Sequence, residues 1–115
     1  MVMEERLYQL KETVRELLLN LIDRIDSITA LYDAGEGAKA NERMVFLTDD
    51  MSVLAEGVRI LEGENFNVSI EDLNRKLDML VQQFENEDYL FVSDLLKYEL
   101  KPLFEQWCEE INDVH

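Results

Sequence analysis

Apolar residues recur every three or four positions along four stretches of the chain. The first stripe is formed by Leu7, Leu10, Val14, Leu17, Leu21, Ile25, Ile28 and Tyr32. The second is formed by Ala40, Met44, Leu47, Met51, Leu54, Val58 and Leu61. This spacing places apolar side chains on one face of an α-helix, which has about 3.6 residues per turn. The pattern predicts helices over residues 4–32 and 38–62, with Gly63 as the C-terminal cap of the second.

Two further stripes follow in the C-terminal half. The third is formed by Leu73, Leu77, Leu80, Val81 and Phe84. The fourth is formed by Tyr89, Val92, Leu96, Leu100, Leu103, Trp107 and Ile111. Ser69 is typical of a helix N-cap, because its hydroxyl can accept a hydrogen bond from the amide of Asp72. We therefore expect a third helix over residues 70–85 and a fourth over residues 89–111.

The fourth stripe crosses Pro102, the only proline, without a change of phase. Proline lacks an amide proton, and its ring pushes away the carbonyl four residues earlier, here that of Tyr98. Lys101 would be a poor N-cap for a new helix. We therefore expect Pro102 to kink one helix instead of separating two.

Short connections join the four expected helices, and short connections favour antiparallel neighbours. The predicted fold class is all-α, an antiparallel up-down-up-down four-helix bundle with its last helix kinked at Pro102. Residues 1–115 are expected to form a single domain. Gly57 lies inside the second helix, where glycine costs about 1 kcal/mol relative to alanine. Close packing against another helix is the favoured explanation, and simple tolerance is the alternative.

Composition narrows the range of partners. Hydrophobic residues make up 47% of the chain and charged residues 32%, which is typical of a globular protein. The formal net charge is -15, and residues 69–115 hold 12 acidic and 4 basic residues. Such a surface repels the phosphates of nucleic acids and anionic membranes, so neither is an expected partner. A basic protein partner is compatible with this charge.

The residue types needed for catalysis are scarce. Cys108 is the only cysteine and His115 the only histidine, so the Glu-x-x-His pairs of di-iron bundles are absent. We expect no metal, no cofactor and no catalytic residue, and therefore no enzyme. The start of the chain lacks the features of a signal peptide, and no apolar stretch is long enough to span a membrane. A cytoplasmic location is expected.

Two helices carry more apolar residues than one core face requires. The fourth has a second stripe, at steps of four, three and four residues, formed by Phe91, Leu95, Tyr98 and Pro102. The second helix has a further row, one heptad apart, formed by Phe46, Val53 and Ile60. A wide core could cover both sets. Alternatively, they could form a surface for a partner protein or for a second copy of the chain, and the stripe on the fourth helix is then the candidate partner-binding site.

Residues 69–107, SIEDLNRKLDMLVQQFENEDYLFVSDLLKYELKPLFEQW, resemble the last two helices of the flagellin-type export chaperones. The shared features are a leucine-rich penultimate helix, a joint of Asn and acidic residues at 86–88, and a final leucine-rich helix with Trp107 near its end. The segment, about a third of the chain, is also similar to small uncharacterised helical proteins of Gram-positive bacteria with an acidic DLL-YEL-P ending. The resemblance implies a cytoplasmic bundle that binds a helical segment of a partner in an apolar groove.

The sequence thus favours a non-enzymatic protein that acts through protein–protein contact, as a chaperone or adaptor of the secretion or motility type. The alternative is a structural or regulatory homodimer without a separate client. An enzyme built from dispersed acidic residues has the weakest support.

Overall fold

The protein is all-helical over the part of the chain that the structure, a computed structural model, describes. Residues 2–113 are described, with side chains from residue 4 to residue 112. The first three helices are α1 (Val2–Asp33), α2 (Gly37–Gly63) and α3 (Ile70–Glu85). The last helix is one unbroken run made of α4 (Tyr89–Leu95), a π-helical turn η1 (Leu96–Leu100) and α5 (Lys101–Asp113). Each bound lies within two residues of the expected one.

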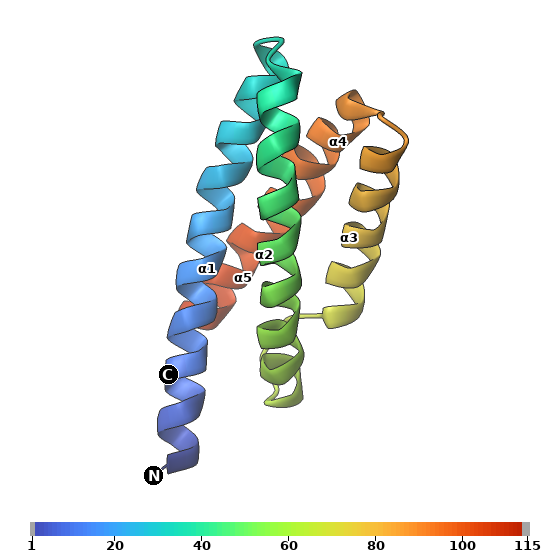
Figure 1. The fold of residues 1–115 in the computed structure, drawn as a ribbon. Coiled ribbons are helices and arrows are strands. Elements are labelled where there is room, and N and C mark those ends of the chain that lie inside the picture. Colours follow the sequence, from blue (N-terminus) through green and yellow to red (C-terminus); the bar gives the residue numbers. More distant parts are fainter. Residues whose placement is uncertain (1, 114–115) are drawn as a thin grey trace.

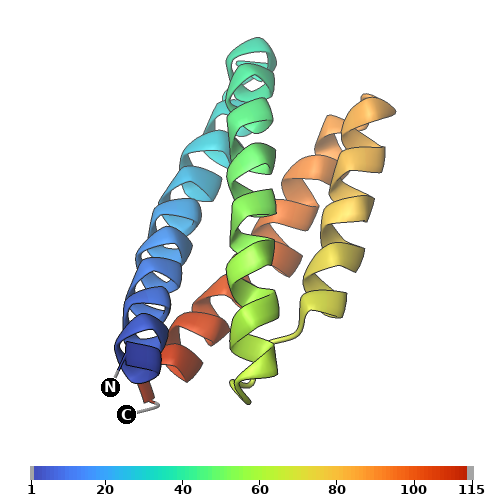
Figure 2. The ribbon, with the colours of Figure 1, turned by 60° about the horizontal axis from the view of Figure 1, so that its bottom comes forward.

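The four helices pack as an antiparallel bundle, which confirms the expected fold class. α1 packs against α2 and α5, and α3 packs against α2 and α4. The molecule is a rod with extents of 51 × 22 × 20 Å. Figures 1 and 2 show that the last helix runs obliquely, beginning beside α3 and ending beside α1.

The three connections between helices share one hydrogen-bonding pattern. At the end of α1, Gly35 has a φ of 77°, its amide donates to the carbonyl of Tyr32, and the amide of Glu36 donates to the carbonyl of Leu31. These two bonds define the Schellman motif, which satisfies carbonyl groups left unpaired at a helix end. The same pair of bonds occurs around Asn65 and Glu87, the two non-glycine residues with positive φ.

The end of α2 corrects one expectation. Gly63 was expected to be the C-terminal cap, but it is the last helical residue, and Asn65 takes the left-handed position with a φ of 69°. The physical reason is the apolar contact that accompanies a Schellman motif. With Asn65 in that position, Phe66 donates its amide to the carbonyl of Leu61, and both side chains are buried.

A single apolar core runs along the bundle. The largest fully buried side chains include Leu18, Leu21, Ile25, Met44, Leu47, Met51, Leu54, Leu73, Leu80 and Phe104. Most residues of the four predicted stripes lie in this core or pack against it. Val81 is an exception, because 40% of its side chain is exposed, so its predicted inward position is wrong. α3 packs against α2 and against the α4 and η1 parts of the last helix, and Val81 lies on a side of α3 that these neighbours leave exposed.

As expected, the last helix continues through Pro102. The distortion lies just before the proline, in η1, where the amide of Lys101 donates to the carbonyl of Leu96, five residues earlier. The core positions in this region are four residues apart and are Val92, Leu96, Leu100 and Phe104, all fully buried. A spacing of four exceeds the 3.6 residues of an α-helical turn, and a wider π turn keeps these side chains on one face.

Gly57 marks a close approach of α1 and α2. A Cβ atom built on Gly57 would lie 2.6 Å from Cγ2 of Val14. Val14 is buried, and its β-branched side chain has one strongly preferred rotamer in a helix. The close-packing explanation for this glycine is therefore confirmed.

Candidate functional site

The four residues of the candidate partner-binding stripe on the last helix differ in their exposure to solvent. Phe91 is 42% exposed and Tyr98 is 69% exposed, and Pro102 also lies on the surface. Leu95 is only 4% exposed, so its expected place on a contact surface is wrong. α4 packs against both α1 and α3, so more of its surface is buried than a single neighbouring helix would bury. Leu95 lies in this buried part. Partner binding by the three exposed residues stays a prediction.

Two ion pairs with α1 lie beside the exposed part of this stripe. Lys97 Nζ lies 2.9 Å from a carboxylate oxygen of Asp33, and Lys101 Nζ lies 2.7 Å from one of Asp26. Hydrogen bonding to these carboxylates raises the pKa of both lysines. The pairs join the region of the π turn to α1. Because Leu95 is buried, Phe91 and Tyr98 are seven residues apart with no exposed apolar residue of the stripe between them, so they do not form a continuous apolar surface.

α2 carries a more regular apolar surface. Phe46, Val53 and Ile60 are 66%, 62% and 52% exposed, so the structure leaves all three uncovered by the bundle. At 1.5 Å per residue, this row of three residues, the α2 row, extends about 21 Å along the helix. It follows the outer edge of the contact between α1 and α2.

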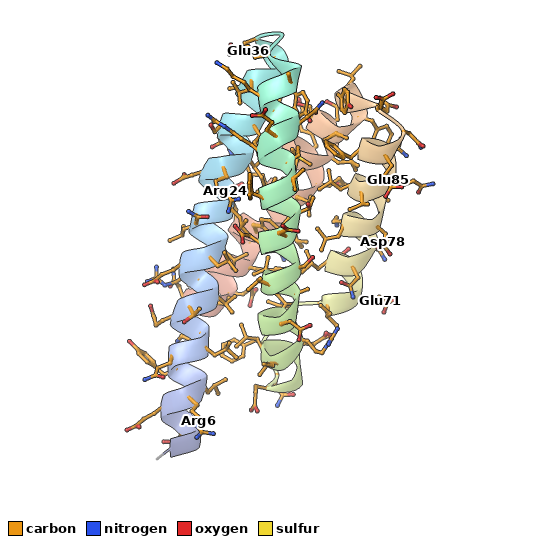
Figure 3. The ribbon with its side chains drawn as sticks, in the orientation of Figure 1. Arg6, Arg24, Glu36, Glu71, Asp78 and Glu85 are labelled. Atoms are coloured by element: carbon orange, nitrogen blue, oxygen red, sulfur yellow. The ribbon has the colours of Figure 1, made fainter. Side chains whose placement is uncertain are left out.

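Each end of the α2 row borders a pocket between α1 and α2. The pocket at Phe46 has a volume of about 190 Å³ and is also lined by Arg24, Ser27, Ile28 and Arg43. The pocket at Ile60 has a volume of about 320 Å³ and is also lined by Arg6, Leu7, Leu10 and Glu64. Figure 3 shows Arg24 on α1 next to α2, and Arg6 near the N-terminal end of α1. The row is therefore a ridge with a concave site at each end.

Two charged borders flank the α2 row. On the α1 side, Arg24 Nη1 lies 2.5 Å from Oδ2 of Asp50, and Arg43 donates to the hydroxyl of Ser27. On the other side lies an exposed acidic row, the α2 acidic row, formed by Glu42, Asp49 and Glu56. Each of these acids precedes a member of the α2 row by four residues, which makes the two side chains neighbours on the helix surface. This acidic row was not predicted, although its heptad spacing is visible in the sequence.

A further concave site lies on the other side of α2 and is lined mainly by polar residues. A groove of about 700 Å³ lies between α2 and α3 and is lined by Arg59, Ile70, Glu71, Asn74, Arg75, Asp78, Met79 and Gln82. Figure 3 shows Glu71, Asp78 and Glu85 following one another along α3. Among the side chains of residues 4–112, no group of three or more histidine, cysteine, aspartate or glutamate residues is placed to hold a metal ion. His115 lies outside the described residues, and the absence of a metal stays a prediction.

Two titratable side chains, the partly buried Tyr32 and the buried Cys108, have shifted pKa values. The hydroxyl of Tyr32 donates to Oδ1 of Asn41 over 2.6 Å, and its ring stacks on Tyr89. Burial raises the pKa of Tyr32 to about 12, so its phenol is protonated at neutral pH. Burial also raises the pKa of the Cys108 thiol, which favours the unreactive protonated form. Neither group is prepared to act as a base or a nucleophile.

No helix in the described part of the chain combines the length and the apolar character that crossing a membrane requires. Comparison with known proteins finds no curated protein and no solved structure that matches the chain. It does find a family model, described as a domain of unknown function (DUF8042), that matches residues 9–110. This match includes both α2 rows, the π turn and nearly all of the buried core. The chain therefore belongs to the DUF8042 family.

Proposed function

We propose that this protein is a non-enzymatic protein–protein interaction module of the cytoplasm, which binds a helical segment of a partner in the manner of a chaperone or adaptor. The observation that carries the proposal is the α2 row. Three large apolar side chains stand one heptad apart and more than half exposed, although the bundle has a complete core without them. Exposed apolar residues in a regular arrangement are typical of interaction sites, whereas isolated ones are common on any surface.

The spacing of the row indicates the shape of the partner. A helix that packs along another helix contacts it through apolar residues that recur every three or four positions. The row provides contact points about 10.5 Å apart, which correspond to successive heptads of a partner helix. An extended strand would instead require an exposed sheet edge, and the described residues contain no strand.

The test compares partner capture by three forms of the protein. In the first variant, Phe46→Ser, Val53→Ser and Ile60→Ser remove the α2 row. In the matched control, Leu19→Ser, Met79→Ser and Val81→Ser remove three exposed apolar residues on α1 and α3. Each form is immobilised and exposed to cytoplasm from its native source, after circular dichroism has verified its fold.

We expect the wild type and the control to retain the same proteins, and the row variant to lose them. The proposal fails if the row variant retains the same proteins as the wild type. A further variant, Phe91→Ser with Tyr98→Ser, measures whether the exposed part of the last helix contributes to the same binding.

A further inference from the structure

We infer that the partner segment is a basic amphipathic helix, which places its apolar residues on the α2 row and its Lys or Arg residues against the α2 acidic row. This inference rests on the proposed function and adds the chemistry of the partner. Its basis is the combination of two parallel rows on one helix, one apolar and one acidic, both with heptad spacing.

The acidic row is available for a partner. Glu56 lies 3.7 Å from Arg59 in an exposed pair. Among the ion pairs of residues 4–112, none involves Glu42 or Asp49. All three acids are exposed and lie one turn before a member of the α2 row. A helix lying on the apolar row would therefore carry one flank along three carboxylates, and basic residues on that flank would form ion pairs with them.

The α1 side of the α2 row further limits which charged residues the partner helix would carry. Arg24 is already paired with Asp50, and Arg43 is held by Ser27. These two arginines therefore do not require acidic residues on the side of the partner helix that faces α1. The charge difference between the two borders also gives the bound helix a defined rotation about its axis, because only one of its flanks can face the α2 acidic row.

A second copy of the chain fits this surface poorly. If two α2 helices pair antiparallel about Val53, Phe46 lies opposite Ile60 of the other copy, which is favourable. The same arrangement brings the α2 acidic rows of the two copies together along one flank, with Glu56 of one copy near Asp49 of the other. Parallel pairing instead places each α2 acidic row against the α1 side of the other copy's row, where Arg24 is already paired with Asp50. In both arrangements the two chains, each with a net charge of -15, repel one another. Like charges directly opposite one another are destabilising, so the surface favours a basic partner over self-association.

The probes for the test are three synthetic helical peptides of about 20 residues, long enough to cover the row. One carries leucine at heptad positions with lysine on the flanks, the second replaces those lysines with glutamate, and the third is a scrambled form of the first. Dissociation constants are measured by fluorescence anisotropy at about 0.15 M salt, where long-range attraction is screened. We expect the basic amphipathic peptide to bind at least about tenfold more tightly than either of the others.

Two variants with equal changes in net charge locate the binding. Glu42→Lys, Asp49→Lys and Glu56→Lys reverse the α2 acidic row, and we expect about tenfold or greater loss of affinity for the basic peptide. Glu71→Lys, Asp78→Lys and Glu85→Lys reverse a row with the same spacing on α3 (Figure 3), and we expect affinity to be retained. Circular dichroism of both variants verifies the fold.

The possible results separate this inference from the proposed function. Equal binding of the scrambled peptide, or equal losses in both variants, would reveal only non-specific charge attraction and would overturn the inference. Failure of the basic peptide to bind would also overturn it. Tighter binding of the acidic peptide, lost on removal of the α2 row, would overturn the inference while supporting the proposed function. A dimer that Val53→Ser dissociates would identify a second copy as the occupant and would overturn the inference.

Discussion

Gly57 has no room for a side chain, although alanine is the better helix former by about 1 kcal/mol. The β-carbon of Gly57→Ala would lie 2.6 Å from Cγ2 of Val14, which is buried and has little rotamer freedom. Overpacking of this kind costs about 1 to 3 kcal/mol, and subtracting the gain in helix propensity leaves an expected fall in the free energy of unfolding of about 1 kcal/mol, and at most about 2 kcal/mol. Urea denaturation followed by circular dichroism measures this change.

Gly63 provides the control for Gly57, because no atom lies within 4 Å of a β-carbon built there. Gly63→Ala should leave stability unchanged or raise it. Adding Val14→Ala to Gly57→Ala removes the clashing methyl group, so the double variant should be more stable than the sum of the two single effects predicts. Equal stability of Gly57→Ala and the wild type would show that α1 and α2 can separate at little cost.

Leu95 and Tyr98 belong to the same predicted stripe but have opposite surroundings. Leu95 is buried, so Leu95→Ser should lower the free energy of unfolding by about 2 to 5 kcal/mol through the cavity and the buried hydroxyl that it creates. Tyr98 is 69% exposed, and Tyr98→Ser should change it by no more than about 0.5 kcal/mol. Phe91→Ser should fall between the two, at about 1 kcal/mol. Thermal denaturation of the three variants tests this order, and a mild effect of Leu95→Ser would contradict the packing of α4.

At the scale of the helices, Glu87 occupies a position that suits glycine. Its φ is 58°, and this left-handed conformation costs an L-residue about 1 to 2 kcal/mol. The two hydrogen bonds of the motif do not involve its side chain. Glu87→Gly relieves the strain but makes the unfolded chain more flexible, so we expect a net stabilisation of about 0.5 to 1 kcal/mol. Gln82→Gly, which introduces glycine at an exposed position inside α3, should destabilise the protein by a similar amount.

The π turn before Pro102 has two possible causes, which a substitution separates. Either the proline ring widens the turn, or the four-residue spacing from Val92 to Phe104 requires it. All four core residues at that spacing are fully buried, so we expect the turn to persist in Pro102→Ala. The fold should also persist, with a change in unfolding free energy within about 1 kcal/mol. A crystal structure of the variant with a regular α-helix over residues 96–100 would identify the proline as the cause.

The helices could be read from the sequence because each one has a continuous apolar stripe and a recognisable end. Ser69 caps α3 as predicted, with its hydroxyl accepting from the amide of Asp72 over 3.1 Å. The stripes do not show how many neighbouring helices pack against each helix. Leu95 is buried because α4 lies between α1 and α3, and Val81 is exposed because α3 stands at an edge of the bundle. Both outcomes depend on tertiary packing, which a single helix pattern does not contain.

The candidate site on α2 was also predictable only in part. The spacing of Phe46, Val53 and Ile60 identified them as lying off the main stripe of α2, and they are exposed. The sequence could not show whether a neighbouring helix would cover them. The closest neighbour on that side is α1, which contacts α2 through Arg24 and Ser27 and leaves the row uncovered.

Over the whole molecule, repulsion between acidic groups should reduce stability at low salt. The net charge of -15 is carried by a rod only 22 × 20 Å across. The Debye length is about 30 Å at 0.01 M salt, so acidic groups on opposite sides of the bundle then repel one another, and about 8 Å at 0.15 M. Exposed ion pairs such as Lys97 with Asp33 also weaken with salt, but each contributes only about 0 to 1 kcal/mol.

We therefore expect the thermal midpoint to rise by a few degrees as sodium chloride increases from about 0.01 to 0.15 M, because relief of the net repulsion outweighs the loss of the ion pairs. Differential scanning calorimetry measures the shift. The variant with Glu71→Lys, Asp78→Lys and Glu85→Lys has fewer acids and more bases on the same fold, so its midpoint should depend less on salt. Chloride is the appropriate anion, because sulfate and phosphate stabilise folded proteins through exclusion from their surface. A midpoint that falls with added chloride would mean that the local ion pairs between helices, and not the net charge, dominate the electrostatic free energy of this bundle.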